Sequence, residues 1–554
     1  MKYALCCAGL LVALSAFAQR DTDESHEQQH DPEKLGTVAF PTSCAPTVQK
    51  SFERGVALLH SFAYDKAEAQ FTEVARQDPN CAMAHWGIAM RLQQLSDQPS
   101  AESFKRGHAE MQQAQALTST PRERAYIDAL AAFYQDLQQD QIGQDVCWFS
   151  FPCVRARAFA DGMAKVHRDY PNDVEGAAFY ALSLLFSAPP NDTTFANAKE
   201  AIAILDPLLV RYRDHPGLAH YIIHACDTPQ LAHLGLNAAR RYAAIAPSSP
   251  HALHMPSHIF ARLGIWQEDI QSNLASIAAT RHTMGMHIGG EGHQLHATDF
   301  LVYALLQVGD DKSARSWVEG VPKVVEEIRQ SGTPIGEWGD YMNAVNAHLP
   351  ALFALETHHW AQAAALPSPP NISPRVATET YWARTIGAAH MHNAKQARKN
   401  AKHYEVLLEK LGKSEEGHLL QYFDVEHDEV LAWRDFAEKK NEDAIRLMRA
   451  AADRQDARGK GEVDLPAREM LADMLLELNL PQDALAEYER SMTIDPNRFN
   501  GLYGAGRAAE LANQPEKARS YYATLVKNCE GSNSDRPELA SVGAALEKKD
   551  TAPK

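Results

Sequence analysis

The feature that most constrains this chain is a repeat of 34 residues near its C-terminus. Ala484 and Tyr488, in the segment LPQDALAEYERSMTIDPN, recur 34 residues later as Ala518 and Tyr522. A period of this length is typical of helix–turn–helix units that stack side by side. The small residue lets the two helices of a hairpin approach closely, and Pro496 ends the unit because proline cannot continue a helix. The repeat therefore predicts an array of helical hairpins.

Degenerate copies of the same unit extend through the rest of the chain. Four further turns carry an alanine each, and the successive spacings up to Ala484 are 49, 34, 47 and 40 residues: Ala314, Ala363, Ala397 and Ala444. Near the N-terminus, the small, aromatic and terminating positions of one unit are filled by Gly55, Tyr64, Ala67, Phe71 and Pro79. No segment alternates apolar and polar residues between turns, as a strand would require. We therefore expect an all-α fold, a right-handed superhelical solenoid of helical hairpins whose concave side is a long binding surface.

The repeats resemble those of the tetratricopeptide repeat (TPR) family. This resemblance implies that the first helix of each hairpin lines the concave side. The runs HPGLAHYIIHACDTP, APSSPHALHMPSHIFARLG, FERGVALLHSF and PNRFNGLYGAGRAAELA resemble, more narrowly, a group of exported bacterial TPR proteins with a histidine-rich centre. That resemblance covers most of the chain and implies the fold and export, but it implies no activity.

The first 18 residues have the pattern of a secretory signal peptide. Lys2 is followed by an apolar stretch and by Ala16-Phe17-Ala18, with cleavage expected before Gln19. No other stretch reaches 18 uninterrupted apolar residues, so we expect no membrane span. These features predict an exported protein, periplasmic or extracellular.

Punctuation by polar and proline-rich segments divides the remaining chain. We expect a flexible N-terminus at 19–45 and an N-terminal TPR-like array at 46–365, with the histidine-rich centre at 215–303. A proline-rich linker at 366–374 would then lead to a C-terminal TPR-like array at 375–535 and a tail at 536–554.

Composition excludes some partners and permits disulfide bonds. The formal net charge is −17, and no block of Lys or Arg stands out, which argues against a nucleic-acid partner. Export permits disulfides, and the candidates are Cys44 with Cys81 and Cys147 with Cys153. Buried free thiols are the equal alternative for each pair.

Histidine is concentrated in the middle of the chain. Eleven of the 25 histidines lie between His215 and His296. His220 and His224 are four residues apart, as are His254 and His258, so each pair would share one face of a helix. For the second pair this holds if the helix begins at Pro250 and runs through Pro256; a helix that begins at Pro256 would leave His254 outside it.

These pairs, with His293, His296 and Asp299, make a candidate metal site. Neutral imidazoles suit Zn, Cu, Fe and Ni, and an added carboxylate favours Zn or non-haem Fe. Neither pair has the glutamate of H-E-x-x-H, which argues against a metalloprotease of that type. Asp227 and Glu291 are candidates to orient the rings, and Glu291 or Tyr303 to transfer protons. The structural alternative is that the histidines hydrogen-bond one another and the main chain.

Two classes of function fit these observations. We favour a protein- or peptide-binding or scaffolding module, with a metal or polar ligand in its histidine-rich groove. The alternative is a metal-dependent enzyme (Zn, Cu or Fe) that acts on a small molecule or peptide there. No G-x-S-x-G, Walker or C-x-x-C motif points to another chemistry. Taken together, the sequence features argue against an enzyme.

Overall fold

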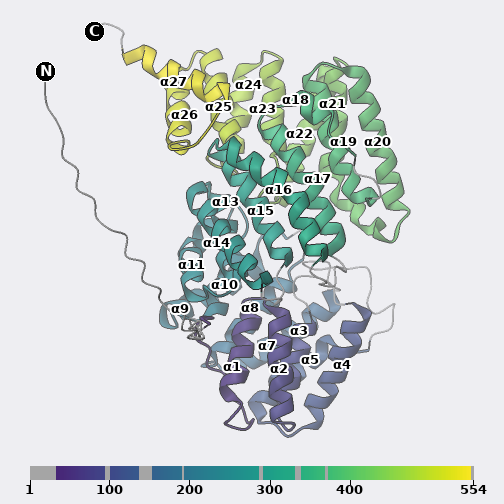
Figure 1. Ribbon diagram of the computed structural model, residues 1–554, viewed down its shortest axis with the longest axis vertical. Helices are drawn as coiled ribbons and strands as arrows, with labels where there is room; N and C mark the ends of the chain where they lie inside the picture. The colour runs from purple at the N-terminus through teal and green to yellow at the C-terminus, as the bar shows by residue number, and fades with distance from the viewer. Residues whose placement is uncertain are drawn as a thin grey trace, which may run out of the picture. The chain divides into compact units, whose positions relative to one another are not determined.

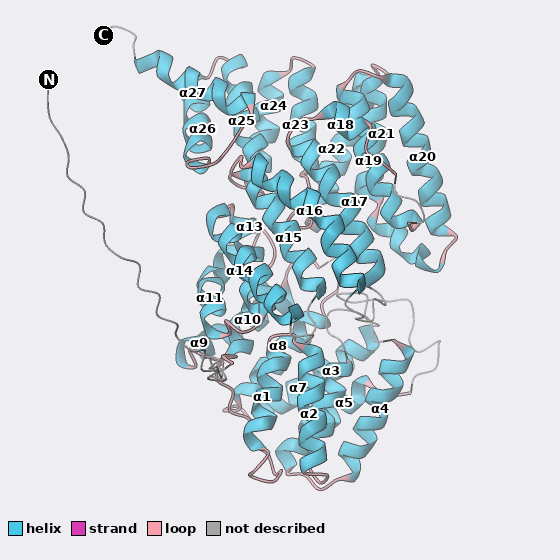
Figure 2. Ribbon diagram, viewed as in Figure 1, coloured by secondary structure: helices cyan, strands magenta, loops and turns pink. Residues whose placement is uncertain are grey.

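The structure is a computed structural model that describes residues 33–93, 100–136, 153–189, 192–285, 291–330, 338–368 and 372–550. Every regular element in these ranges is a helix, and none of the described residues forms a strand (Figure 2). The expected all-α fold is confirmed. None of the described helices combines the length and apolarity needed to cross a membrane.

The helices follow one another as packed neighbours along the chain, and Figure 1 labels most of them. The N-terminal helices are α1 (Gln49–His60), α2 (Tyr64–Gln77), α3 (Ala82–Leu92), α4 (Ala101–Ala116), α5 (Pro121–Phe133), α7 (Cys153–Asp169), α8 (Val174–Phe186) and α9 (Ala196–Arg211). The central helices are α10 (Pro216–Cys226), α11 (Ala232–Ile245), α12 (Pro250–His254), α13 (Pro256–Leu263), α14 (Trp266–Gly285), α15 (Glu291–Gln307), α16 (Asp311–Gln330) and α17 (Trp338–Glu356).

The C-terminal part continues the same succession of packed neighbours. Its helices are α18 (Trp360–Ala364), α19 (Pro374–His390), α20 (Ala394–Gly412), the 3₁₀ helix η2 (Glu415–Tyr422), α21 (Asp424–Ala437), α22 (Asn441–Arg458), α23 (Ala467–Glu477), α24 (Pro481–Ser491), α25 (Phe499–Leu511), α26 (Pro515–Asn528) and α27 (Pro537–Asp550). Both α17 and α18 pack on α19, across the segment 366–374 expected to be a linker.

Close packing inside the hairpins explains the residues that define the repeat. A Cβ at Gly504 would lie 2.2 Å from Cζ of Tyr488, and a Cβ at Gly506 would lie 2.2 Å from Cε1 of Tyr522. Both tyrosines are almost fully buried. The helices can approach this closely only where one of them lacks a side chain.

Both ends of the array differ from the expectation of a flexible terminus and a tail. The extended segment 34–45 packs on the helices: Phe40 is fully buried between Phe52 and Trp86, and the Thr37 amide donates to the Asp214 carbonyl. At the other end, α27 packs on α26. Apolar side chains such as Phe40 and Val542 explain why these segments fold onto the array. Residues 1–32 lie outside the described residues.

A disulfide joins Cys44 to Cys81, and so ties the N-terminal segment to the start of α3. Cys153 is also disulfide-bonded, whereas Cys147 lies outside the described residues. Cys226 and Cys529 are buried free thiols.

Candidate metal centre

Four helices of the central region bring the predicted histidines together. His220 and His224 lie on α10, His254 ends α12, and His258 lies on α13. His293 and His296 lie on α15, which contacts both α12 and α13. A seventh histidine, His251 on α12, joins them although no histidine lies four residues from it in the sequence.

The local sequence explains the course of the chain at α12 and α13. The Ser249 hydroxyl accepts a hydrogen bond from the Ala252 amide and caps α12, with Pro250 in the first helical position. A new helix begins at Pro256, which was one of the two alternatives expected from the sequence. Met255 between them has helical φ and ψ of −51° and −32°, so His254 and His258 still share one face.

The first cluster consists of His220, His224 and His251, whose ligand nitrogens lie within 4.8 Å of one another. His220 is fully buried, and its Nδ1–H donates to the carbonyl oxygen of His60 at 2.6 Å. This bond leaves the lone pair on Nε2, which faces Nε2 of His251 at 3.0 Å. In the metal-free protein, Nε2–H of His251 donates to this lone pair.

The second cluster consists of His254, His258 and His296 and meets the same limit of 4.8 Å. Nδ1 of His254 lies 2.7 Å from Oδ1 of Asn273, whose amide nitrogen donates to Asp269. Because Asn273 is oriented by Asp269, it accepts from His254, and the lone pair of His254 is on Nε2. This Nε2 faces Nε2 of His258 at 3.0 Å.

His258 is held from behind by two carboxylates from distant parts of the chain. Its Nδ1 lies 2.9 Å from Oδ2 of Asp227 and 2.9 Å from Oε1 of Glu462. Asp227 was predicted to orient a ring; Glu462, between α22 and α23, was not. With Nδ1–H donating, both Nε2 atoms of the His254–His258 pair carry lone pairs when the rings are neutral. That arrangement is repulsive unless a proton or a metal ion lies between them.

Burial sets the protonation of the other rings. Burial first, and then neighbouring histidines, lowers the pKa of His220, His251 and His254 well below the usual range. The same causes lower the pKa of His224 and of His296 to about 3. These five imidazoles are neutral at pH 7 and available as ligands.

His258 titrates in the opposite direction. Burial lowers its pKa, but the charges of Asp227 and Glu462 outweigh burial and raise it to about 10. In the metal-free protein a second proton on His258 therefore satisfies the contact with His254. A metal ion would have to displace that proton.

The other predicted site residues lie at different positions. The His293 ring is 5.1 Å from that of His251, beside the first cluster. Asp299 faces His348, with Oδ1 3.7 Å from Nε2, and belongs to neither cluster. Tyr303 is buried beside Trp266, and its hydroxyl contacts Arg498. Glu291 is the first residue of α15, and its side chain lies outside what the structure describes.

A buried ion-pair network lies next to the first cluster and contacts it through His60. Oε2 of Glu175 accepts from Nε2 of His60 at 2.7 Å, and Oε1 accepts from Nε2 of His215 at 2.9 Å. Burial raises the pKa of Glu175, but the two histidines outweigh it and hold the pKa far below the usual range. Glu175 thus fixes His60, the residue whose carbonyl oxygen orients His220.

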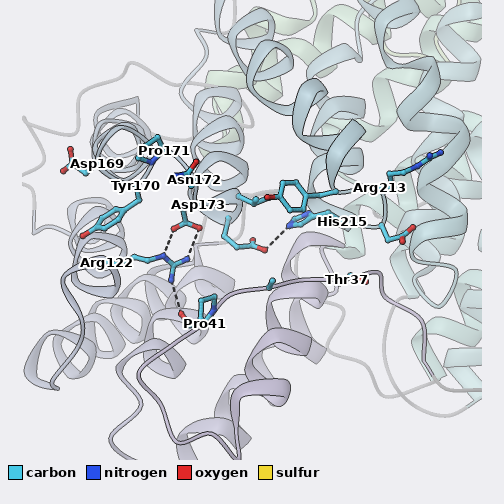
Figure 3. Close-up of a pocket in the computed structure, with 15 residues that line it drawn as sticks. Thr37, Pro41, Arg122, Asp169, Tyr170, Pro171, Asn172, Asp173, Arg213 and His215 are labelled. Atoms are coloured by element: carbon cyan, nitrogen blue, oxygen red, sulfur yellow. Dashed lines mark hydrogen bonds and ion pairs between the residues drawn. The ribbon is translucent and has the colours of Figure 1, made fainter.

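This network also lines one side of a cavity of about 720 Å³. Several of the charged groups around the cavity are paired with each other. Arg122 lies between Asp173 and the carbonyl oxygen of Pro41, and Glu175 pairs with His215 (Figure 3). Sequence reasoning found neither this cavity nor Glu175, which has no local motif.

A second cavity, of about 400 Å³, is lined by Glu379, Glu426, Glu429 and Asp464. Glu429 is 2% exposed and accepts from the indole nitrogen of Trp382 at 2.7 Å. Burial, with nearby Asp464 and Glu379, raises the pKa of Glu429 from 4.5 to about 8 against the effect of that hydrogen bond. The folded protein therefore holds this proton more tightly than the unfolded chain does.

This shift predicts a pH dependence of stability. The contribution of Glu429 is fully present below about pH 4.5 and is lost as the pH rises through about 8, by up to about 1.4 kcal/mol per pH unit. Glu429→Gln keeps the shape and the acceptor for Trp382, so it should flatten the decline between pH 5 and 8. Urea unfolding at intervals of one pH unit measures both curves; parallel curves for the two proteins would contradict the prediction.

Comparison with known proteins adds little beyond the fold. No protein-family model and no curated protein matches the sequence. Among solved structures, the chain is similar to a human IFIT1 dimer with m7Gppp-AAAA, with 13% identity and a TM-score of 0.35 over 80% of this chain and 90% of that one. The TPR domain of P58(IPK) has 12% identity and a TM-score of 0.21, over 69% and 100%. At this level of similarity, neither protein indicates what this chain binds.

Proposed function

We propose that this chain is a helical-repeat protein that binds first-row transition metal ions in its histidine-rich centre. One observation carries the proposal. Two pairs of Nε2 atoms face each other at 3.0 Å, His220 with His251 and His254 with His258. Two imidazoles on one tetrahedral ion, each about 2.05 Å from it, hold their nitrogens about 3.3 Å apart.

The partners behind the rings support the same proposal. Metal-ligating histidines commonly donate their second ring N–H to a carbonyl, an amide or a carboxylate, which fixes the tautomer and the direction of the lone pair. His220 donates to a main-chain carbonyl, His254 to Asn273, and His258 to Asp227 and Glu462. In the metal-free protein these contacts are imidazole hydrogen bonds, and the same Nε2 atoms become ligands when a metal ion replaces the shared proton.

Export is part of the proposal. The first 18 residues have the pattern of a signal peptide, and the Cys44–Cys81 disulfide suits an oxidising compartment. Metal would then be acquired outside the cytoplasm, and the experiment must use protein recovered from an exported fraction.

Metal content tests the proposal directly. Protein purified from the periplasm without a histidine tag should carry near-stoichiometric transition metal by mass spectrometry. The variant His220→Ala/His254→Ala removes one ligand from each cluster and should lose that metal. His403→Ala/His418→Ala, which changes two exposed histidines elsewhere, is the matched control and should keep it.

Two results would count against metal binding. The first is the absence of metal from the wild-type protein, also after reconstitution with Zn²⁺, Cu²⁺ and Fe²⁺. The second is a lower melting temperature in the His220→Ala/His254→Ala variant with no change in metal content. The second result would identify the histidines as structural.

A further inference from the structure

We infer that the centre holds a pair of copper ions, one in each histidine cluster and about one helical turn apart. The inference rests on the proposed metal binding and adds the number and the identity of the ions. Nothing in the repeat pattern or in the comparisons requires either.

The number of ions follows from two pairs of histidines on neighbouring helices, which we call the histidine ladders. His251 and His254 are three residues apart on α12, and His293 and His296 are three residues apart on α15. The rings pair across the helices, His251 with His293 at 5.1 Å and His254 with His296 at 4.5 Å. Each helix thus gives one imidazole to the second cluster, while α12 gives His251 to the first cluster and α15 places His293 beside it.

The remaining ligands come from two other helices. The i,i+4 pair His220 and His224 completes the first cluster from α10, and His258 completes the second from α13. Residues three apart on a helix have Cβ atoms about 5–6 Å apart. Two ions seated on the ladders would therefore lie at roughly that separation, which is short enough for direct interaction.

The identity follows from the donor atoms. Both clusters offer imidazole nitrogens alone, with no thiolate or carboxylate among the ligand groups. Mononuclear non-haem Fe(II) sites typically add a carboxylate to two histidines, and divalent copper binds such ligands more tightly than zinc or the other divalent metals of its row. In direct competition, these imidazole sets should therefore bind copper more tightly than zinc.

The nearby carboxylates do not form a third cation site. Asp227 and Glu462 both contact Arg262, at 3.1 Å from Nε and 3.4 Å from Nη2 respectively. The guanidinium that contacts both carboxylates is 8% exposed, so a cation bound there would meet a buried positive charge. The two carboxylates orient His258 and leave metal binding to the imidazoles.

The experiment is a competitive titration of the full-length metal-free protein with Cu²⁺ and Zn²⁺, followed by electron paramagnetic resonance. We expect two equivalents of copper per chain, bound at least about tenfold more tightly than zinc. The spectrum of the fully loaded protein should show magnetic coupling between the two ions, and His403→Ala/His418→Ala should behave as the wild type.

The outcomes separate this inference from the proposed function. One equivalent of copper, two uncoupled coppers, or zinc that displaces copper at equal concentration would overturn the copper pair while leaving metal binding intact. Failure to bind any transition metal would overturn metal binding itself.

Discussion

Arg498→Ala is expected to lower the free energy of unfolding by about 3–5 kcal/mol, as loss of one partner from a buried ion pair does. Arg498 is fully buried. Its Nη2 lies 2.6 Å from Oε1 of Glu356 and 2.9 Å from Oε1 of Glu469, and both carboxylates are buried. Without the guanidinium, two carboxylates would remain together without their cation, and α17, α23 and α25 would lose their common contact.

Chemical denaturation at pH 7 measures this effect. Arg507→Ala is the matched control, because Arg507 is 45% exposed and pairs with Glu510 on its own helix, where such a pair contributes about 0.3–0.5 kcal/mol. Arg498→Lys keeps the charge but loses the planar fork, so its stability should lie between those of the wild type and the alanine variant. Equal effects of Arg498→Ala and Arg507→Ala would refute the role of the network.

The fold was predictable because its determinants are local and repeated. The spacing of Ala484 and Ala518, and of Tyr488 and Tyr522, records the close helix contacts that the structure shows at Gly504 and Gly506. The packing of 34–45 was not predictable, because the segment before it is charged and has no apolar period. It depends on isolated apolar anchors such as Phe40, whose pocket is built by residues far along the chain.

The histidine centre was predictable only in part, for a related reason. Pairs four residues apart are visible in a sequence, and the structure places His220 with His224 in one cluster and His254 with His258 in another. His251 was missed because its neighbours in space come from other helices. Glu462 lies 204 residues from His258 in the sequence, so no local pattern connects them.

Asp299 shows that a local pattern can also include a residue that does not belong to the site. Its position three residues after His296 puts it on the same side of α15 in projection, which made it a candidate ligand. In the structure the carboxylate turns toward His348, and the charges of Asp299 and Glu379 outweigh burial and raise the pKa of His348 to about 10. Helical spacing predicts that two residues share a face, but it does not predict which neighbouring helix each side chain contacts.

Single-histidine variants should therefore each remove one ion and leave the other. His224→Ala affects only the first cluster and His296→Ala only the second, so each protein should retain about one equivalent of metal, and the double variant almost none. Loss of a direct ligand should weaken its own site by more than the 10–100-fold typical of losing an outer partner. Metal content by mass spectrometry, with affinity by competition against a chelator, measures both effects.

Asp299→Asn is the control that separates the structural assignment from the sequence pattern. If the ligands are the clustered imidazoles, this variant should keep both ions at unchanged affinity, because Asp299 faces His348. Loss of an ion from Asp299→Asn would restore the carboxylate to the site and favour iron or zinc over copper. Loss of both ions from either single-histidine variant would mean that the two clusters bind metal as one inseparable unit.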